Sequence, residues 1–137
     1  MSQNFEDIGT ATRQPGWHKV ADPATGWFAS KTSGWTADSF SGGLTVDFST
    51  VVPVGTRAVR VYIDAATTLS IVSWRAGSDS NISNTPQASG ENAHQLFNSS
   101  DGGAVVVVWL SAAYTVDFAV ASTGTDLYVS YPSEYLL

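Results

Sequence analysis

The sequence predicts an all-β fold, an antiparallel β-sandwich of jelly-roll type with about eight strands. Segments of alternating apolar and polar residues recur at a spacing of roughly ten residues, which is typical of sandwiches. No segment shows the 3.6-residue period of an amphipathic helix. Charged residues are only 13% of the chain, so surface polarity depends on Ser, Thr, Asn and Gly, a mixture that favours strands and turns.

The domain organisation is predicted from the length of the chain and from the positions of glycine and proline residues. At 137 residues the chain has the size of one domain. Residues 1–16 show no sustained period and contain Gly9, Pro15 and Gly16, so we expect an extended N-terminal arm there, followed by a single β-sandwich domain over residues 17–137. The first residues carry no basic region and no apolar stretch, so we expect no secretory signal and synthesis in a cytoplasm.

The clearest strand follows a Pro/Gly turn at residues 53–55 and begins near Arg57. Its alternation turns one set of side chains toward the core, namely Val59, Val61 and Ile63. A preceding strand is predicted by the alternation of Leu44, Val46 and Phe48. After a short connection, residues 69–75 look like the hairpin partner of the strand 57–64.

The second half of the chain predicts four more strands. Residues 93–97 are a short candidate before the Asp-Gly-Gly turn at residues 101–103. Residues 104–110 are apolar on both faces, which predicts a central strand covered from both sides, and a neighbouring subunit could cover one of them. Residues 114–120 and 126–131 complete the set, and Pro132 is expected to end the ladder.

Composition narrows the classes of partner. The net charge is −6, from six basic and twelve acidic residues, which argues against direct nucleic-acid binding because the chain cannot form a phosphate-neutralising stripe. No apolar run reaches the roughly 20 residues of a membrane helix. The absence of cysteine excludes disulfides and thiolate metal sites. We therefore expect no nucleic acid and no membrane among the partners.

Catalytic signatures are sparse, and we expect neither an enzyme nor a cofactor. His18 and His94 are the two histidines; a triad built on His94 stays open because triads assemble through space, but no nucleophile motif accompanies it. A pair of carboxylates could serve glycoside hydrolysis, although outward solvated positions are the simpler interpretation; these are Asp47, Asp64 and Asp117. Part of a calcium-loop pattern makes three residues candidate ligands, namely Asp79, Asn81 and Asp101.

Aromatic residues crowd the segment 17–40, and the loop 76–92 is longer than an ordinary connection. The aromatics either cover one end of the core or form a surface for a sugar or a protein partner. Together with the loop and the arm they supply the residues we expect at a partner contact: Phe5, Trp17, Trp27, Phe28, Trp35, Ile82 and Pro86. For a sugar, the expected stacking platforms are Trp17, Trp27, Trp35 and Tyr62.

The run Val46-Asp47-Phe48-Ser49-Thr50-Val51-Val52-Pro53-Val54-Gly55-Thr56-Arg57-Ala58-Val59-Arg60-Val61 resembles a segment of small β-rich proteins of tailed bacteriophages. Those segments have Asp-aliphatic-Ser, then Val-Pro-x-Gly, then Ala-Val in an alternating strand. The apolar strand 104–110 and the segment 127–131 are similar to their final strands. The likeness spans residues 44–131, and the Trp-rich segment 17–40 and the loop 76–92 have no counterpart in it.

The resemblance implies a virion structural protein without catalytic residues. A short acidic chain with no fibrous shaft suits capping or cementing a shell. We therefore expect a decoration or cement protein of the phage head that assembles as a homo-oligomer, a trimer, and binds the major capsid protein or other virion proteins. The alternative is a carbohydrate-binding module or a receptor-binding domain that uses exposed aromatic residues.

Overall fold

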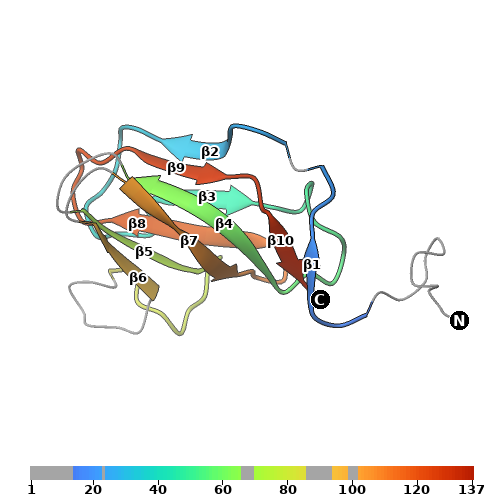
Figure 1. Ribbon diagram of the computed structural model, residues 1–137. Coiled ribbons are helices and arrows are strands. Elements are labelled where there is room, and N and C mark those ends of the chain that lie inside the picture. The colour runs from blue at the N-terminus through green and yellow to red at the C-terminus, as the bar shows by residue number, and fades with distance from the viewer. Residues whose placement is uncertain (1–13, 23, 66–69, 86–93, 99–101) are drawn as a thin grey trace, which may run out of the picture.

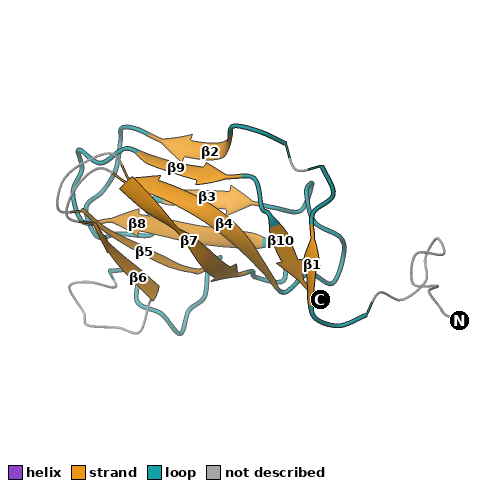
Figure 2. Ribbon diagram, in the orientation of Figure 1, coloured by secondary structure: helices purple, strands orange, loops and turns teal. Residues whose placement is uncertain are grey.

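Two antiparallel sheets pack face to face and enclose the apolar core (Figure 1). The computed structural model describes residues 14–22, 24–65, 70–85, 94–98 and 102–137. These residues form ten strands and no helix (Figure 2). The expected all-β sandwich is confirmed. No described segment is a helix that could cross a membrane.

Sheet A holds six strands. Five of them follow the order β1 (Trp17–Lys19), β10 (Glu134–Leu136), β4 (Ala58–Ala65), β9 (Leu127–Ser130) and β2 (Trp27–Lys31). The sixth, β7 (Gly102–Trp109), pairs with β4 along its whole length. β4 is therefore the centre of the sheet, with β7 on one edge and both β10 and β9 along the other.

Sheet B holds four strands in the order β3 (Leu44–Asp47), β8 (Thr115–Val120), β5 (Ser70–Ala76) and β6 (His94–Asn98). The inward residues of β4, Val59, Val61 and Ile63, are almost completely buried, as their alternation predicted. They meet buried side chains of sheet B such as Val72 and Phe118 in one cluster. Burying apolar area between two sheets is the main stabilising contribution to a fold of this kind.

The pairing of β5 differs from the prediction. Residues 69–75 looked like the hairpin partner of β4, but β5 lies in sheet B and pairs with β6 and β8. Residues close in sequence often pair, yet a sandwich also needs connections that pass from one sheet to the other. β4 instead pairs with three strands that follow much later in the chain.

The C-terminal end of the chain also differs from the prediction. Pro132 was expected to end the ladder, but the chain resumes as β10 and continues along the same edge of β4 as β9. Pro132 interrupts the pairing because it has no N–H. At the interruption the Tyr62 N–H donates to the Ser130 hydroxyl at 2.8 Å, and the Ser133 N–H donates to the Arg60 carbonyl oxygen at 2.9 Å.

Most of the expected arm lies outside the described residues, which begin at Gln14. Its last residue, Gly16, is part of the fold. Gly16 exchanges two backbone hydrogen bonds with Leu137, at 3.1 Å and 3.0 Å, and the C-terminal end lies beside β1 (Figure 1). Within the described residues, pairing with the C-terminal strand therefore already includes Gly16, the residue before the expected boundary at Trp17.

β7 was predicted to be a central strand, and this is wrong for the described chain. β7 pairs with β4 alone among the described strands. Val106 and Val108 point inward, but Val105 on the opposite face is 62% exposed. Valines on both faces gave the appearance of a covered strand.

Gly103 in β7 allows an unusually close approach to β4. A methyl group added there would lie 1.8 Å from the Ile63 carbonyl oxygen, which belongs to rigid backbone. We expect Gly103→Ala to lower the free energy of unfolding by about 1–3 kcal/mol, measured by urea denaturation. Gly124→Ala is the control, because its added methyl meets nothing closer than 3.9 Å. Equal stabilities of the two variants would contradict the close approach.

Candidate functional site

The outer face of sheet A carries most of the large exposed apolar side chains of the described chain. Residues that lie opposite one another in a sheet point to the same face. One row across the sheet contains Trp17, Leu136, Ala58 and Trp109. The next outward position of β4 beyond Arg60 is Tyr62, which lies opposite Val105. We call the set Trp17, Trp27, Tyr62, Val105 and Trp109 the aromatic surface.

Trp27 reaches this face because of a β-bulge in β2. Trp27 lies opposite Ser130 and Ala29 lies opposite Val129, so Phe28 is the extra residue. An extra residue reverses the alternation and re-aims the side chains on either side of it. Trp27 therefore points outward and is 44% exposed, whereas Ala29 packs against the core.

Two rings of the aromatic surface, Trp27 and Tyr62, contact each other. Trp27 stacks on Tyr62 with 6.2 Å between the ring centroids, and its ring lies 5.3 Å from that of Tyr128. Aromatic side chains lose little conformational entropy on binding, and such a cluster offers a rigid apolar contact. It occupies the part of sheet A formed by β2, β9 and β4.

Charge on this face is concentrated beside Trp17. The Arg60 guanidinium lies 4.8 Å from the centre of the Trp17 ring, and its Nε lies 3.1 Å from Glu134 Oε1. Both charged side chains are partly exposed, so the ion pair contributes little to stability. Its effect is to hold the guanidinium near the Trp17 ring, which leaves a surface that is polar at the β1 end and aromatic at the β2 end.

The predicted partner-contact residues fall into three groups. Trp17 and Trp27 are exposed on the aromatic surface, together with Tyr62, which was expected as a sugar platform. Phe5 and Pro86 lie outside the described residues. The remaining three belong to the body of the domain: Phe28, Trp35 and Ile82.

Phe28 and Trp35 do not provide the exposed surface that was expected. Phe28 stacks on Phe48 with 5.2 Å between centroids and meets the edge of Tyr131. Trp35 is only 6% exposed and belongs to the core, with the Lys31 ammonium over its ring. Both aromatic side chains pack within the domain, because filling a small core takes large side chains.

The described part of the long loop, residues 77–85, is fastened to the body. Arg75 donates from one Nη to the carbonyl oxygens of Asp79 and Ile82, at 3.2 Å and 2.8 Å. Asn84 joins the end of this loop to residues 39–41. Its backbone carbonyl oxygen accepts from the Phe40 N–H, and its side chain forms hydrogen bonds with Ser39 and Ser41. Ile82 is therefore held by its backbone while its side chain is partly exposed.

Beneath this loop lies a buried ion pair. Asp117 Oδ2 accepts from Arg75 Nε at 3.0 Å and from the Ser78 N–H at 2.9 Å, while Oδ1 accepts from the Thr45 hydroxyl at 2.8 Å. The guanidinium also lies 4.5 Å from the Phe40 ring. Asp117 does lie on the outward side of β8, in register with Thr45 and Arg75. It was expected to be solvated and is instead buried, because the loop folds over it.

Two of the three candidate carboxylates, Asp47 and Asp117, lie on the same face of paired strands, and the third lies in the other sheet. Asp64 is on the outer face of sheet A, whereas Asp47 and Asp117 are on the outer face of sheet B. Asp117 is bound by Arg75. Asp47 accepts a hydrogen bond from the Ser49 N–H at 2.9 Å, and bonds from the Ser49 backbone and side chain lower the pKa of this exposed carboxyl. The two histidines are also separated, with His18 in sheet A and His94 in sheet B.

The candidate calcium ligands are only partly visible. The Asp79 carboxylate accepts from the Asn81 N–H at 3.0 Å, and the Asp79 carbonyl oxygen is taken by Arg75. A guanidinium so close weakens the attraction for a second cation. Asp101 lies outside the described residues, so the three-ligand site stays a prediction. Within the residues that the structure describes, no three His, Asp or Glu side chains gather as metal ligands.

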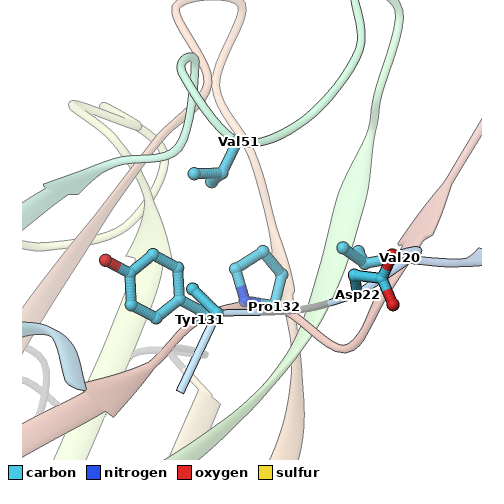
Figure 3. Close-up of a pocket in the computed structure, with 6 residues that line it drawn as sticks. Val20, Asp22, Val51, Tyr131 and Pro132 are labelled. Carbon is cyan, nitrogen blue, oxygen red and sulfur yellow. The ribbon is translucent and has the colours of Figure 1, made fainter. Parts of the chain in front are cut away.

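A small cavity of about 200 Å³ opens between the segment 20–24, Val51 and the β9–β10 connection. Its lining is apolar except for Asp22 and the Tyr131 hydroxyl (Figure 3). Figure 3 shows Tyr131 at one side of Pro132 and Asp22 with Val20 at the other. Typical small-molecule pockets are larger, about 300–1,000 Å³, so the cavity fits one side chain of a partner better than a cofactor.

Sequence reasoning missed three residues of the outer face. Val105 and Trp109 were assigned to a covered strand, and Tyr128 was not singled out. The alternation of residues 104–110 could have placed Val105, Val107 and Trp109 on one face, but nothing in it says that the face is open.

A scan against models of known protein families, a search of curated proteins and a search of solved structures each found no match to this chain.

Proposed function

We propose that the protein is a non-enzymatic structural protein of a virion, a decoration or cement protein that stabilises the head of a tailed bacteriophage. The observation that carries the proposal is the aromatic surface, a group of exposed apolar side chains spread over β1, β2, β4 and β7. Contiguous exposed apolar area on a soluble domain marks a contact with another macromolecule. The resemblance of residues 44–131 to small phage proteins indicates the class of partner, the major capsid protein or another virion protein.

The geometry suits docking onto a broad surface. The aromatic surface lies on a sheet rather than in a cleft. Trp27 stacks on Tyr62, and Trp17 lies beside the Arg60 guanidinium. Protein interfaces have an aromatic centre surrounded by polar residues. Here Trp27 and Tyr62 form the aromatic part, and Lys19, Arg60 and Glu134 supply polar residues toward the β1 side.

Trp27→Ala is expected to weaken binding of the purified protein to expanded phage heads that lack it by roughly 30-fold, the loss of about 2 kcal/mol that follows removal of an aromatic anchor. Binding is measured by co-sedimentation over a range of protein concentrations. Val54→Ala is the control, because Val54 is 90% exposed but lies in the turn before β4. Head binding that Trp27→Ala leaves unchanged would contradict the role of this surface, and no binding by the unaltered protein would refute the proposed function.

The second candidate is a carbohydrate-binding or receptor-binding domain. The observation that favours it is the Trp27–Tyr62 stack beside Tyr128, since sugars bind against exposed aromatic rings. Glycan-array binding that disappears in Trp27→Ala, without any binding to phage heads, would favour this function. Trp35 does not contribute to such a site because it is buried.

A further inference from the structure

The free edge of β7 is the feature of sheet A that the proposed function leaves without a role. Within the described chain, β7 bonds β4 on one side and no strand on the other. It is eight residues long, as long as the central strand β4. An edge of this length presents a row of backbone donors and acceptors that can bind another strand.

The register shows which groups face the free edge. Leu110 N–H donates to the Arg57 carbonyl oxygen at 2.9 Å, and these two residues lie opposite each other one step beyond the Ala58–Trp109 pair. Opposite residues alternate between bonded and non-bonded pairs in an antiparallel ladder. Val108, Val106 and Ala104 therefore bond β4. The backbone groups of the alternate residues point to the free edge: Gly103, Val105, Val107 and Trp109.

This edge lacks the features that protect edges in most sheets. Residues 102–109 contain no charged residue and no proline, and the β4–β7 register runs without a bulge. Charged side chains, prolines and bulges are the usual means of preventing strand addition. β-Branched residues such as the valines here also favour pairing. The backbone groups on this edge are therefore open to pairing with another strand.

We propose that the occupant of this edge is a second copy of the chain, whose β7 pairs antiparallel with the first across a two-fold axis at Val106. This register sets Val105 opposite Val107 of the other copy. It also sets Trp109 opposite Gly103, where an indole ring can lie over a residue without a side chain. All four residues that face the free edge then pair, which gives roughly eight backbone hydrogen bonds.

Self-pairing through β7 is compatible with the net negative charge of the chain. Each copy carries a net charge of −6, so two copies can meet closely only where acidic side chains are absent. The strand β7 meets this condition. An isologous contact also needs a surface that is complementary to itself, and the Val105–Val107 and Gly103–Trp109 matches provide it. The two aromatic surfaces would then share one face of a continuous sheet.

The first test is the oligomeric state of the purified full chain by light scattering over a range of concentrations. We expect a dimer that dissociates at least tenfold more readily in Val105→Lys, because lysines then approach each other across the axis. Val105→Thr keeps a β-branched residue and should remain dimeric. Val54→Lys adds the same charge in the exposed turn before β4 and should also remain dimeric. Circular dichroism and thermal melting check that Val105→Lys is folded.

The second test measures the register by disulfide cross-linking. The chain contains no cysteine, so each introduced cysteine is the only thiol that can react. Val105→Cys and Val107→Cys, mixed and oxidised mildly, should form a disulfide between the two variants in far greater yield than either variant forms alone. A monomer, a trimer, a dimer that Val105→Lys leaves intact, or equal cross-linking in all three samples would overturn the inference.

The inference does not depend on the proposed function. Head binding is measured separately on the same variants. If the chain binds heads but does not dimerise, only the proposed dimer is contradicted. If it dimerises but does not bind heads, only the proposed decoration role is contradicted.

Discussion

Asp117→Ala is expected to lower the free energy of unfolding by about 3–5 kcal/mol, because it removes one partner of a buried ion pair. Arg75 keeps its place under the loop 77–85 but loses its carboxylate, and the Ser78 N–H and the Thr45 hydroxyl lose their acceptor as well. The charge left behind is poorly hydrated. Urea denaturation followed by tryptophan fluorescence measures the loss.

Asp47→Ala is the matched control for this variant. Asp47 is an acid on the adjacent strand β3, exposed to solvent and bonded only locally to Ser49. Its removal changes the net charge by the same amount and should cost far less stability. Arg75→Met combined with Asp117→Leu should recover part of the loss, since no buried charge remains unpaired. A cost for Asp117→Ala no larger than that of Asp47→Ala would show that the ion pair does not hold the loop.

Phe48→Ala is expected to destabilise the protein by about 3–5 kcal/mol, the cost of deleting a fully buried aromatic side chain. Phe48 has no exposed surface and follows β3 of sheet B, while Phe28, on which it stacks, belongs to β2 of sheet A. The pair therefore joins the two layers. Alanine leaves a cavity that rigid strands on both sides cannot close. Thermal and urea unfolding both report the loss.

Two variants separate the packing of Phe48 from a general effect of losing an aromatic ring. Phe48→Leu retains much of the apolar volume and should cost less than alanine. Tyr62→Ala removes an exposed ring from the outer face of sheet A and should change stability only slightly. If Tyr62→Ala were as harmful as Phe48→Ala, the outer face would be contributing to stability rather than serving as a docking surface.

Local patterns in the sequence predict the strands that are buried on one face. The alternation of Val59, Val61 and Ile63 predicted the inward face of β4 correctly, and Val46 and Phe48 are buried as expected. The same logic missed β2, because the bulge at Phe28 breaks the two-residue period. It also missed β10, because Pro132 predicted the end of the last strand, whereas the chain rejoins the sheet two residues later.

Partners in space were much harder to predict than strands. Arg75 and Asp117 are 42 residues apart, and neither shows by itself that it is buried. β7 was misread because a strand of valines looks the same whether its second face is covered or open. The exposed half of the candidate site, Trp17 and Trp27, was identified by residue type alone, and the same reasoning wrongly included Trp35, whose ring is in the core.

The position of β10 between β1 and β4 constrains how the protein is made. Both neighbours emerge from the ribosome long before residues 134–136, which must join them. At translation rates of about 5–20 residues per second, the growing chain waits for several seconds with β4 incompletely paired. Its apolar residues are a natural target for chaperones during that interval. Sheet A is therefore completed only after residues 134–136 have emerged, and premature association of nascent chains is the hazard before that point.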